Sequence, residues 1–409
     1  MPVATSMTWR CALLSALLLT ANHCQAHLAG EGAIPESPGL RIGASAAAAW
    51  LDADDAVPAP RLTGVAGLGD TPEDQRGGRL EHATVDLGLR LHPRLGMALA
   101  IGWHDGEPAH VEAAWIELRR QADAELVLGA GRNRVPIGAP LRTAGHFDRF
   151  AHMPLVKRAS FNGDWIEDGI NVSWRPHLDA PWGWLQSIDV GLWRAERFPG
   201  SEDAPWAPVV HMGAAWSDIE LDAFYSHIRP RRRGAYVQRA GSGHVHTAPR
   251  CDTSLRDITC MDGTVDLLGA SLAWDTPVPG LRVTGAALMR HERGDLYSQN
   301  GSTRYEGRSH GGWVEAVWQP GASWDLGVRQ EWLTGTNRLA GPGAALVAAD
   351  AGLSPNHPAR RSAAMVGWRP MESLLLTFEI GQERIDGRSN RYLGARLLWT
   401  PETLFERSW

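Results

Sequence analysis

The sequence predicts an all-β protein, a single antiparallel up-and-down transmembrane β-barrel of about 16 strands. Three observations support this prediction. Apolar and polar residues alternate through most of the chain after residue 40, and a period of two is typical of strands with one apolar face. The alternating segments have mostly about 10 to 13 residues, and a tilted strand that crosses a bilayer needs about 9 to 11. Short and long connections also follow one another in turn, as in up-and-down membrane barrels.

The composition excludes several classes of protein. Charged residues make up 21% of the 409 residues, and the formal net charge is -6. We therefore expect neither a disordered chain nor a general nucleic-acid binder. Tryptophan occurs 19 times, against 7 Phe and 5 Tyr. Because Trp is favoured where an apolar ring must keep a polar edge in water, its excess indicates an interface.

Residues 1–26 have the pattern of a signal peptide. Arg10 precedes an apolar run at 11–21, and Ala26 is a small residue suited to cleavage. A run of about 11 apolar residues is too short to cross a ~30 Å hydrocarbon core, so a membrane anchor is the weaker alternative. Residues 27–39 are expected to form a short periplasmic N-terminal segment, too short for a plug domain. No later stretch approaches about 18 consecutive apolar residues, so helical membrane spans are not expected.

The barrel itself is expected over residues 40–400, followed by a C-terminal tail at 401–409. The predicted strands are 40–52, 80–92, 94–104, 109–121, 123–134, 164–175, 184–196, 206–216, 218–228, 264–275, 281–293, 310–319, 323–335, 359–370, 372–384 and 390–400.

Tryptophans recur at one position of these strands, the last place on the apolar face before a short turn. Pro often follows and ends the strand, because it cannot donate a ladder hydrogen bond. Trp prefers the headgroup level of a membrane, so we expect these rings to form one girdle of the barrel. The second and fourth strands lack such a Trp. The six girdle residues are Trp174, Trp216, Trp274, Trp318, Trp368 and Trp399.

The polar face of the strands is expected to line a hydrated lumen, which about 16 strands leave room for. The alternative is that these charges pair with one another and merely keep the wall polar. The candidates for the lumen wall are Arg90, Glu117, Arg282, Arg329, Glu331, Glu379 and Arg396.

A resemblance to a known family lies within residues 131–174. The motifs are GR, IG, a loop His, PLVKRA at 154–159, DG and SW. In this order they resemble Gram-negative outer-membrane porin-like proteins, including phosphate-selective-porin-like ones, some of which are described as zinc-regulated. The resemblance implies a barrel that transports solutes, with a tie to zinc supply. This chain lacks the dense His-rich tract that zinc supply would favour.

The connection 135–163 is the third on the long-loop side. By analogy with general porins, we expect it to fold inward and narrow the pore. It carries four basic residues against one Asp, and it holds the only lysine of the chain. The constriction candidates are Arg142, His146, Asp148, Arg149, His152, Lys157 and Arg158.

The long connection 229–263 is also rich in arginine. Rings of Arg and Lys favour anions in pores, although a basic loop can also face lipopolysaccharide or water. Cys251 and Cys260 lie in this connection, and in an exported chain they are expected to form a disulfide. Free thiols are the alternative.

The sequence predicts neither a metal site nor a catalytic one. His146 and His152, and the pair His244 and His246, could capture a transition metal, but no carboxylate or Cys spacing completes a site, so no metal and no cofactor is expected. Phosphate-binding, zinc-protease and nucleophile-elbow motifs do not occur in the sequence, so the protein is not expected to be an enzyme.

The sequence thus predicts an outer-membrane porin of a Gram-negative bacterium, a passive diffusion channel for small hydrophilic solutes that leans towards anions. Its expected partners are the lipid bilayer, lipopolysaccharide and small solutes, with a homotrimer as the candidate assembly and no nucleic acid. Three alternatives stay open: a structural barrel that holds a partner in its lumen, a barrel related to zinc uptake, and a soluble periplasmic β-protein.

Overall fold

The computed structural model describes residues 33–57, 64–66, 74, 76–104, 108–122, 124–143, 145–161, 164–177, 183–236, 251, 255, 258–401 and 403–409. Its strands are β1 Gly39–Ala53, β2 Gly77–His92, β3 Leu95–Trp103, β4 His110–Gln121, β5 Ala124–Arg134, β6 Ile166–Pro176, β7 Leu185–Arg194, β8 Trp206–Trp216, β9 Ile219–Ile228, β10 Arg233–Tyr236, β11 Ile258–Asp275, β12 Leu281–Ser298, β13 Gly301–Gly321, β14 Trp324–Ala340, β15 Asn356–Met371, β16 Leu374–Ile385, β17 Arg388–Trp399 and β18 Phe405–Ser408. The helical segments are α2 Ala139–Arg142, η3 Gly145–Phe147, α3 Leu155–Phe161 and α4 Ala344–Asp350.

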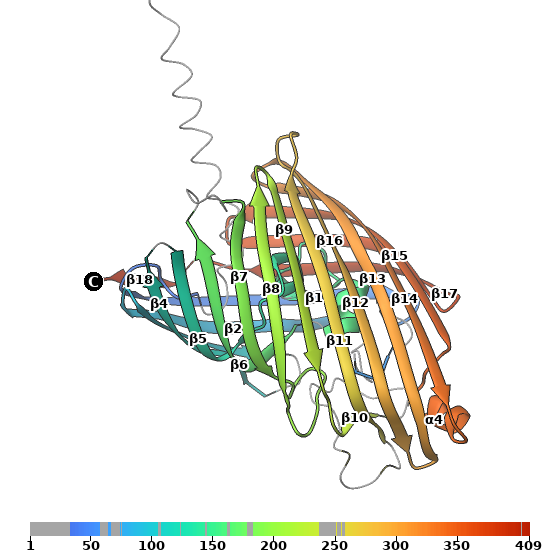
Figure 1. Cartoon of the computed structure of the whole chain (residues 1–409). Helices are drawn as coiled ribbons and strands as arrows, with labels where there is room; N and C mark the ends of the chain where they lie inside the picture. The colour runs from blue at the N-terminus through green and yellow to red at the C-terminus, as the bar shows by residue number, and fades with distance from the viewer. Residues whose placement is uncertain are drawn as a thin grey trace, which may run out of the picture.

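The strands close into a 16-strand antiparallel barrel, which confirms the predicted fold class (Figure 1). Neighbours in sequence pair with one another, and β1 closes the ring by pairing with β17, from Ala46 opposite Trp399 to Ala53 opposite Tyr392. Two short strands pair with the ends of wall strands and are not counted among the 16: β10 pairs with β11, and β18 pairs with the start of β1. None of the helices in the described part of the chain is long and apolar enough to span a bilayer.

One expectation about a connection was wrong. Residues 294–309 were expected to form a long loop, but β12 and β13 continue through them and meet at a tight turn where Ser298 pairs with Gly301. Alternating side chains continue in this stretch, but the buried apolar residues Leu296 and Tyr305 are separated by polar ones, so the pattern was not recognised. The tail at 401–409 contains a strand, β18, because its backbone finds a partner in residues 39–42 of β1.

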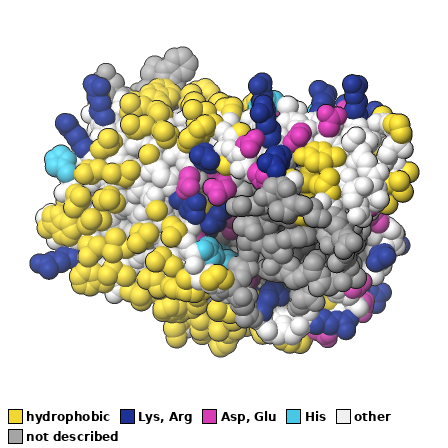
Figure 2. Space-filling view, turned by 90° about the horizontal axis from the view of Figure 1, so that it is seen from below, with side chains coloured by type: hydrophobic (Ala, Val, Ile, Leu, Met, Phe, Trp, Pro, Cys, Tyr) yellow, Lys and Arg dark blue, Asp and Glu magenta, His cyan; other side chains and the backbone are white. Residues whose placement is uncertain are grey.

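The outer face carries apolar side chains between two levels of tryptophan. Trp206 and Trp216, at the two ends of β8, are 52% and 81% exposed. About 10 residues at ~3.4 Å each, tilted by about 40°, span about 25 Å along the barrel axis, the height of an outer-membrane apolar band. Figure 2 shows hydrophobic side chains covering a broad zone of one face, with most charged side chains in a separate zone beside it.

The predicted Trp girdle lies at the short-turn end of the barrel. Of its six members, all except the half-buried Trp174 are among the exposed large apolar residues. Trp324 adds a ring from an ascending strand, 6.4 Å from the ring of Trp368. Trp50 and Trp332 are exposed nearer the other end of the strands, so a second level of tryptophans exists that the sequence pattern did not reveal.

Candidate functional site in the barrel lumen

The connection between β5 and β6 folds into the lumen. Its described parts, 135–143 and 145–161, are called the inward segment below. They contain α2, η3 and α3, and Leu141, Phe150 and Leu155 are almost completely buried. Part of the interior core is built from this segment and the inner wall, where Phe161 packs 6.3 Å from the ring of Phe224. The segment therefore occupies one side of the lumen.

Arginines of the wall hold the inward segment by its backbone carbonyls. Arg396 of β17 donates to the carbonyl oxygen of Gly145 at 2.9 Å. Arg361 of β15 donates to Met153 at 3.0 Å. Two further wall arginines also donate to carbonyls of the segment, Arg329 to His152 and Arg290 to Ala159. Such charge-assisted bonds are stronger than neutral ones, so four strands share in fixing the segment.

Wall carboxylates bind the same segment through its amides. The N–H of Leu155 donates to Glu331 at 2.6 Å, and the N–H of His152 donates to Glu379 at 3.2 Å. Because Glu331 and Glu379 are both about 99% buried or more, these bonds satisfy charges that would otherwise be costly to bury. The predicted wall residues thus serve first as anchors of the inward segment.

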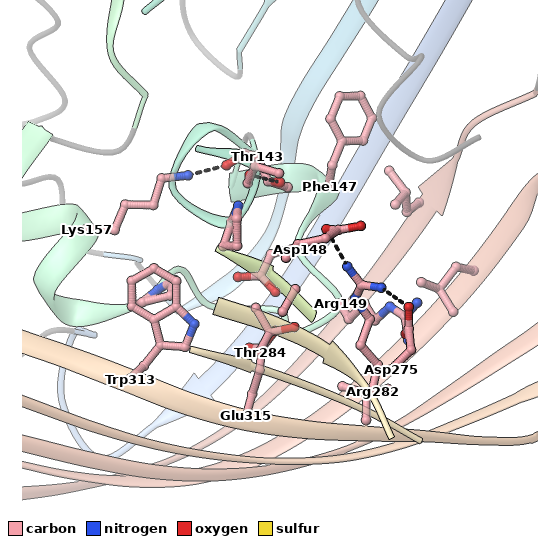
Figure 3. Close-up of a pocket in the computed structure, with 18 of the residues that line it drawn as sticks. Thr143, Phe147, Asp148, Arg149, Lys157, Asp275, Arg282, Thr284, Trp313 and Glu315 are labelled. Atoms are coloured by element: carbon pink, nitrogen blue, oxygen red, sulfur yellow. Dashed lines mark hydrogen bonds and ion pairs between the residues drawn. The ribbon is translucent and has the colours of Figure 1, made fainter. Parts of the chain in front are cut away.

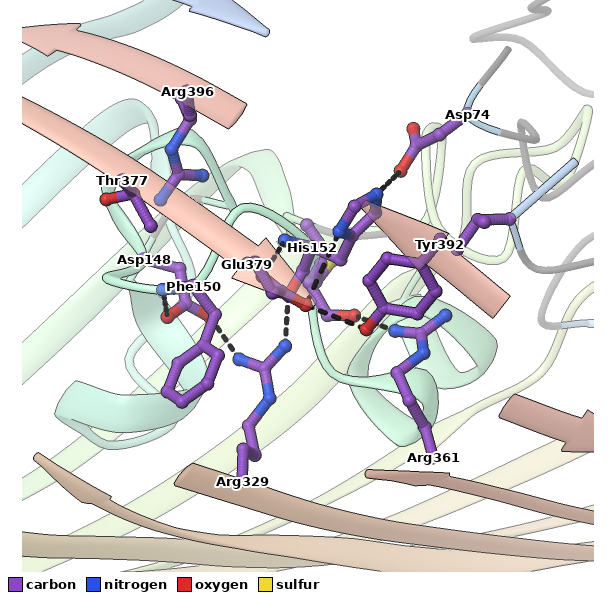
Figure 4. A network of polar contacts seen from close by, with 12 residues as sticks. Asp74, Asp148, Phe150, His152, Arg329, Arg361, Thr377, Glu379, Tyr392 and Arg396 are labelled. Carbon is purple, nitrogen blue, oxygen red and sulfur yellow. Dashed lines mark hydrogen bonds and ion pairs between the residues drawn. The ribbon is translucent and has the colours of Figure 1, made fainter. Parts of the chain in front are cut away.

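His152 lies at the centre of a polar network (Figure 4). Its Nδ1 is 3.4 Å from Glu379, and its Nε2 is 3.7 Å from Asp74. Tyr392 of β17 donates to the same Glu379 at 2.7 Å. Asp74 also pairs with Arg158 at 3.1 Å. Burial raises the pKa of Asp74, but the nearby arginines outweigh burial and hold its pKa well below the ordinary 3.8.

Most of the predicted constriction charges are paired. Asp148 accepts from Arg329 at 3.1 Å, and Arg158 pairs with Asp74. Lys157 is buried, 3.5 Å from Asp164, and burial lowers its pKa.

Two cations of the inward segment remain available. Arg142 is exposed on α2, and Arg149 is half-buried. Neither forms an ion pair with another residue in the described ranges. Of the basic residues that the sequence places in the 135–163 connection, these two side chains are therefore the ones without an ion pair in the described ranges.

A cavity of about 470 Å³ lies beside the inward segment (Figure 3). Arg149 and Lys157 line it from the segment, while Arg282 and Glu315 line it from the wall. Arg282 is paired with Asp275 at 2.7 Å. Both signs of charge therefore face this space, as expected of a hydrated lumen.

The remaining wall candidates, Arg90 and Glu117, form a separate pair near the short-turn end, at 2.6 Å. Arg90 also donates to the carbonyl of Pro35 at 2.5 Å. A Cβ on Gly88 would lie 1.9 Å from the carbonyl oxygen of Ala33, so β2 needs a glycine there. The described part of the N-terminal segment, 33–38, therefore lies against the inner wall rather than apart from it.

Sequence reasoning missed one inward residue of the wall, Arg361. It pairs with Glu383 at 2.9 Å, and both are buried with the other wall charges. The alternation could have found Arg361, because it lies on the same face as Ala363 and Met365. Its exposed neighbour Arg360 obscured the pattern. In the next long connection, Cys251 and Cys260 form a disulfide; His244 and His246 lie outside the described residues.

Comparison with known proteins finds the same architecture among solved outer-membrane structures. No protein-family model and no curated protein matches the chain. Among solved structures, outer-membrane expressed OmpT of Vibrio cholerae is 10% identical, with a TM-score of 0.54, over 90% of this chain and 99% of that one. The outer membrane channel DcaP of Acinetobacter baumannii is 9% identical, with a TM-score of 0.52, over 91% and 100%. OmpF of Salmonella typhi is 10% identical, with a TM-score of 0.50, over 89% and 98%. The chain therefore has the 16-strand barrel fold of outer-membrane porins.

Proposed function

We propose that the protein is an outer-membrane channel through which small hydrophilic solutes diffuse passively. The observation that carries the proposal is the lumen: a polar wall, an inward segment anchored across it, and a cavity lined by charges of both signs. Transport of this kind needs a hydrated path and a size limit, but no catalytic group, and we propose no enzymatic activity.

The outer face supports a membrane location over a soluble one. Large apolar side chains such as Val190, Val210 and Leu192 are about half exposed on neighbouring strands. Soluble proteins rarely expose contiguous apolar surface of this kind, whereas a barrel in a bilayer buries it in lipid. We propose the outer membrane of a Gram-negative bacterium as the location and lipopolysaccharide as a neighbour. A homotrimer is the proposed assembly, and OmpT of Vibrio cholerae has been solved in a trimer form.

Reconstitution in planar bilayers tests the channel. Purified protein, folded in detergent and verified by the mobility difference between boiled and unboiled samples, should give discrete conductance steps in KCl. A folded barrel that inserts, as judged by co-flotation with liposomes, but never conducts would instead be a structural barrel with an obstructed lumen.

We also propose that the channel leans towards anions because of Arg142 and Arg149. Reversal potentials in a KCl gradient should show anion preference in the native protein, and Arg149→Ala should reduce it, since Arg149 lines the cavity without an ion pair. Arg308→Ala is the matched control, because Arg308 is 57% exposed outside the lumen and pairs with Glu306. Cation selectivity of the native channel would reject the charge preference while leaving the channel itself intact.

A further inference from the structure

Four histidines and a glutamate gather where β2, β3 and β4 approach the long-loop side of the barrel. His82 of β2 is fully buried and lies 2.7 Å from Glu112 of β4. His104, just after β3, has its ring centroid 4.6 Å from that of His82. His110 at the start of β4 lies 3.4 Å from Glu112. The sequence analysis did not single out His82, His104 or His110, because only the barrel register brings these three strands together here.

The inward segment completes the group. His146 in η3 stacks on His82, with ring centroids 3.9 Å apart, and only 6% of its surface is exposed. The sequence pattern had paired His146 with His152, but the structure puts the two in different clusters, His152 beside Glu379 and His146 beside His82.

Hydrogen bonds orient two of these rings, and that of His104 is the bond a metal-ligating ring makes. Nδ1 of His104 lies 2.9 Å from the carbonyl oxygen of Glu81 and must donate to it, which leaves Nε2 as the ring's acceptor in the neutral form. Nε2 of His82 donates to Oε1 of Glu112 at 2.7 Å, and Nδ1 lies 3.0 Å from the hydroxyl of Thr84. A metal ion bound at Nε2 would take the place of that proton, and Nδ1 would then donate to Thr84. A ligating His commonly donates its second ring N–H to a carbonyl, a carboxylate or water, as His104 does to Glu81, because that bond fixes the tautomer.

Two further observations point to a ligand between these side chains. Glu112 is only 6% exposed, and its Oε2 is buried without a hydrogen-bond partner among the described residues. In addition, Gly102 of β3 leaves space at the donor atoms: a Cβ there would lie 2.6 Å from Oε1 of Glu112 and 2.9 Å from Nε2 of His82. A buried carboxylate oxygen without a partner is costly, and a cation would relieve that cost.

We propose that His82, His104 and Glu112 bind one divalent transition-metal ion of the Zn²⁺ type. One donor atom from each of the three lies within 4.8 Å of the others. Ligands at about 2.0–2.2 Å around a tetrahedral ion lie about 3.3 Å apart, so side-chain shifts of about 1 Å would close the site. Two imidazoles and one carboxylate suit Zn²⁺, Cu²⁺ or Ni²⁺, whereas Ca²⁺ and Mg²⁺ prefer oxygen-only sites.

The surroundings give the site an entrance and a further ligand. His104 and His110 are only partly buried, while His82 and Glu112 are deep. An ion can therefore meet the two outer imidazoles first and then move to the carboxylate. His110 is placed to occupy the fourth position, because it already lies beside Glu112. His146 connects the site to the inward segment, because its ring stacks on the ring of His82, one of the proposed ligands.

Metal titration of the full-length protein tests the site. Chelator-stripped protein in detergent should bind one Zn²⁺ per chain in competition with a chromophoric chelator, and millimolar Mg²⁺ should not displace it. Co²⁺ in place of Zn²⁺ should give the visible absorption of a nitrogen- and oxygen-ligated ion. Absence of stoichiometric binding would refute the proposal.

Three variants locate the ion. Glu112→Gln should weaken Zn²⁺ binding by more than roughly 100-fold. Thr84→Val, which removes the hydroxyl beside Nδ1 of His82, should weaken it by roughly 10- to 100-fold. Gly102→Ala keeps every ligand but fills the space between them, and it should weaken binding strongly while the boiled and unboiled gel mobilities stay as in the native protein. Because its clashes are with side-chain ends, this variant is expected to fold even if Glu112→Gln does not.

Two controls separate this site from other histidines. His310→Ala removes an exposed imidazole of β13, and the double variant His244→Ala/His246→Ala removes the pair in the 229–263 connection. Both should bind Zn²⁺ as the native protein does. Binding that survives Gly102→Ala and Glu112→Gln but disappears in the 244/246 variant would assign the metal elsewhere and overturn the proposal. The inference does not depend on the proposed channel, because a barrel that never conducts could still bind the ion.

Discussion

Replacing Arg329 with methionine should release the inward segment from the barrel wall. Arg329 lies on β14 with its side chain fully buried. It is 3.1 Å from Asp148 and 2.9 Å from Glu331, it donates to the carbonyl of His152, and its guanidinium lies 4.2 Å from the ring centre of Phe150. Methionine keeps much of the volume but removes every polar contact.

The magnitude follows from the charges left behind. Asp148, Glu315 and Glu331 surround one cation, and its removal leaves three carboxylates without it. Removing one partner of a buried ion pair costs about 3–5 kcal/mol. Since 1.4 kcal/mol is a factor of ten, local opening of the inward segment should become roughly 100-fold or more easier.

Hydrogen exchange measures this opening directly. Backbone amides of residues 145–161, including Leu155, should lose roughly 100-fold in protection in Arg329→Met, and single-channel current should become noisier. Arg308→Met is the control, because the side chain of Arg308 is 57% exposed and pairs with Glu306 rather than with the inward segment. The double variant Arg329→Met/Asp148→Asn should recover part of the protection, since it removes one uncompensated charge. Unchanged protection of 145–161 in a folded Arg329→Met protein would refute the anchoring role.

Three further predictions concern the membrane, pH and the disulfide. Val190→Arg, midway between the tryptophan levels, should cost about 2–4 kcal/mol of folding into liposomes and Trp216→Arg only about 0–1; equal costs in chemical unfolding would contradict the assigned membrane position. Because the pKa of Asp74 is lowered in the folded protein, its contribution to the stability of the fold should be complete above the ordinary pKa of 3.8 and be lost only as the pH falls below that value. Asp74→Asn should therefore lower the hydrogen-exchange protection of the inward segment already at pH 7. A loss of this protection in the native protein between pH 7 and 5 would argue against the role of Asp74. Reduction of the bond between Cys251 and Cys260 should lower the thermal midpoint while preserving the gel shift, because closing a loop of about 10 residues is worth about 3 kcal/mol; loss of the gel shift would show that the barrel depends on it.

The barrel could be predicted from the sequence because the alternation that identifies each strand lies within a few neighbouring residues. Each strand has to present apolar residues to one side and polar residues to the other, so Val190 and Leu192 reveal their face by spacing alone. The extension of β12 and β13 could not be predicted in this way. Its outer face is polar, as in the cross-strand pair of Asp295 and Arg304, and on its inner face the buried Leu296 and Tyr305 are separated by polar residues.

The site was readable only in part. The inward orientation of Arg329 and Glu331 followed from alternation. The inward fold of the 135–163 connection was predicted by analogy with the third outer loop of general porins. Their bonding to the backbone of His152 and Leu155 did not, because main-chain carbonyls and amides carry no sequence signal. The cluster around His82 was hidden for a related reason: its members come from four segments that only strand register and an inward fold bring together.

The pairing of β1 with β17 has a consequence for how the molecule assembles. Every other junction in the wall joins strands close in sequence and can form as a hairpin, but this one joins residues 46 and 399. Closing a loop of about 350 residues costs about 3 kcal/mol more than closing one of about 10, so it should form last, and until then two strand edges stay open to wrong partners. Once this junction has formed, every strand of the wall is paired on both sides. Two ladders must then break before any one strand can leave, so the finished barrel should unfold slowly.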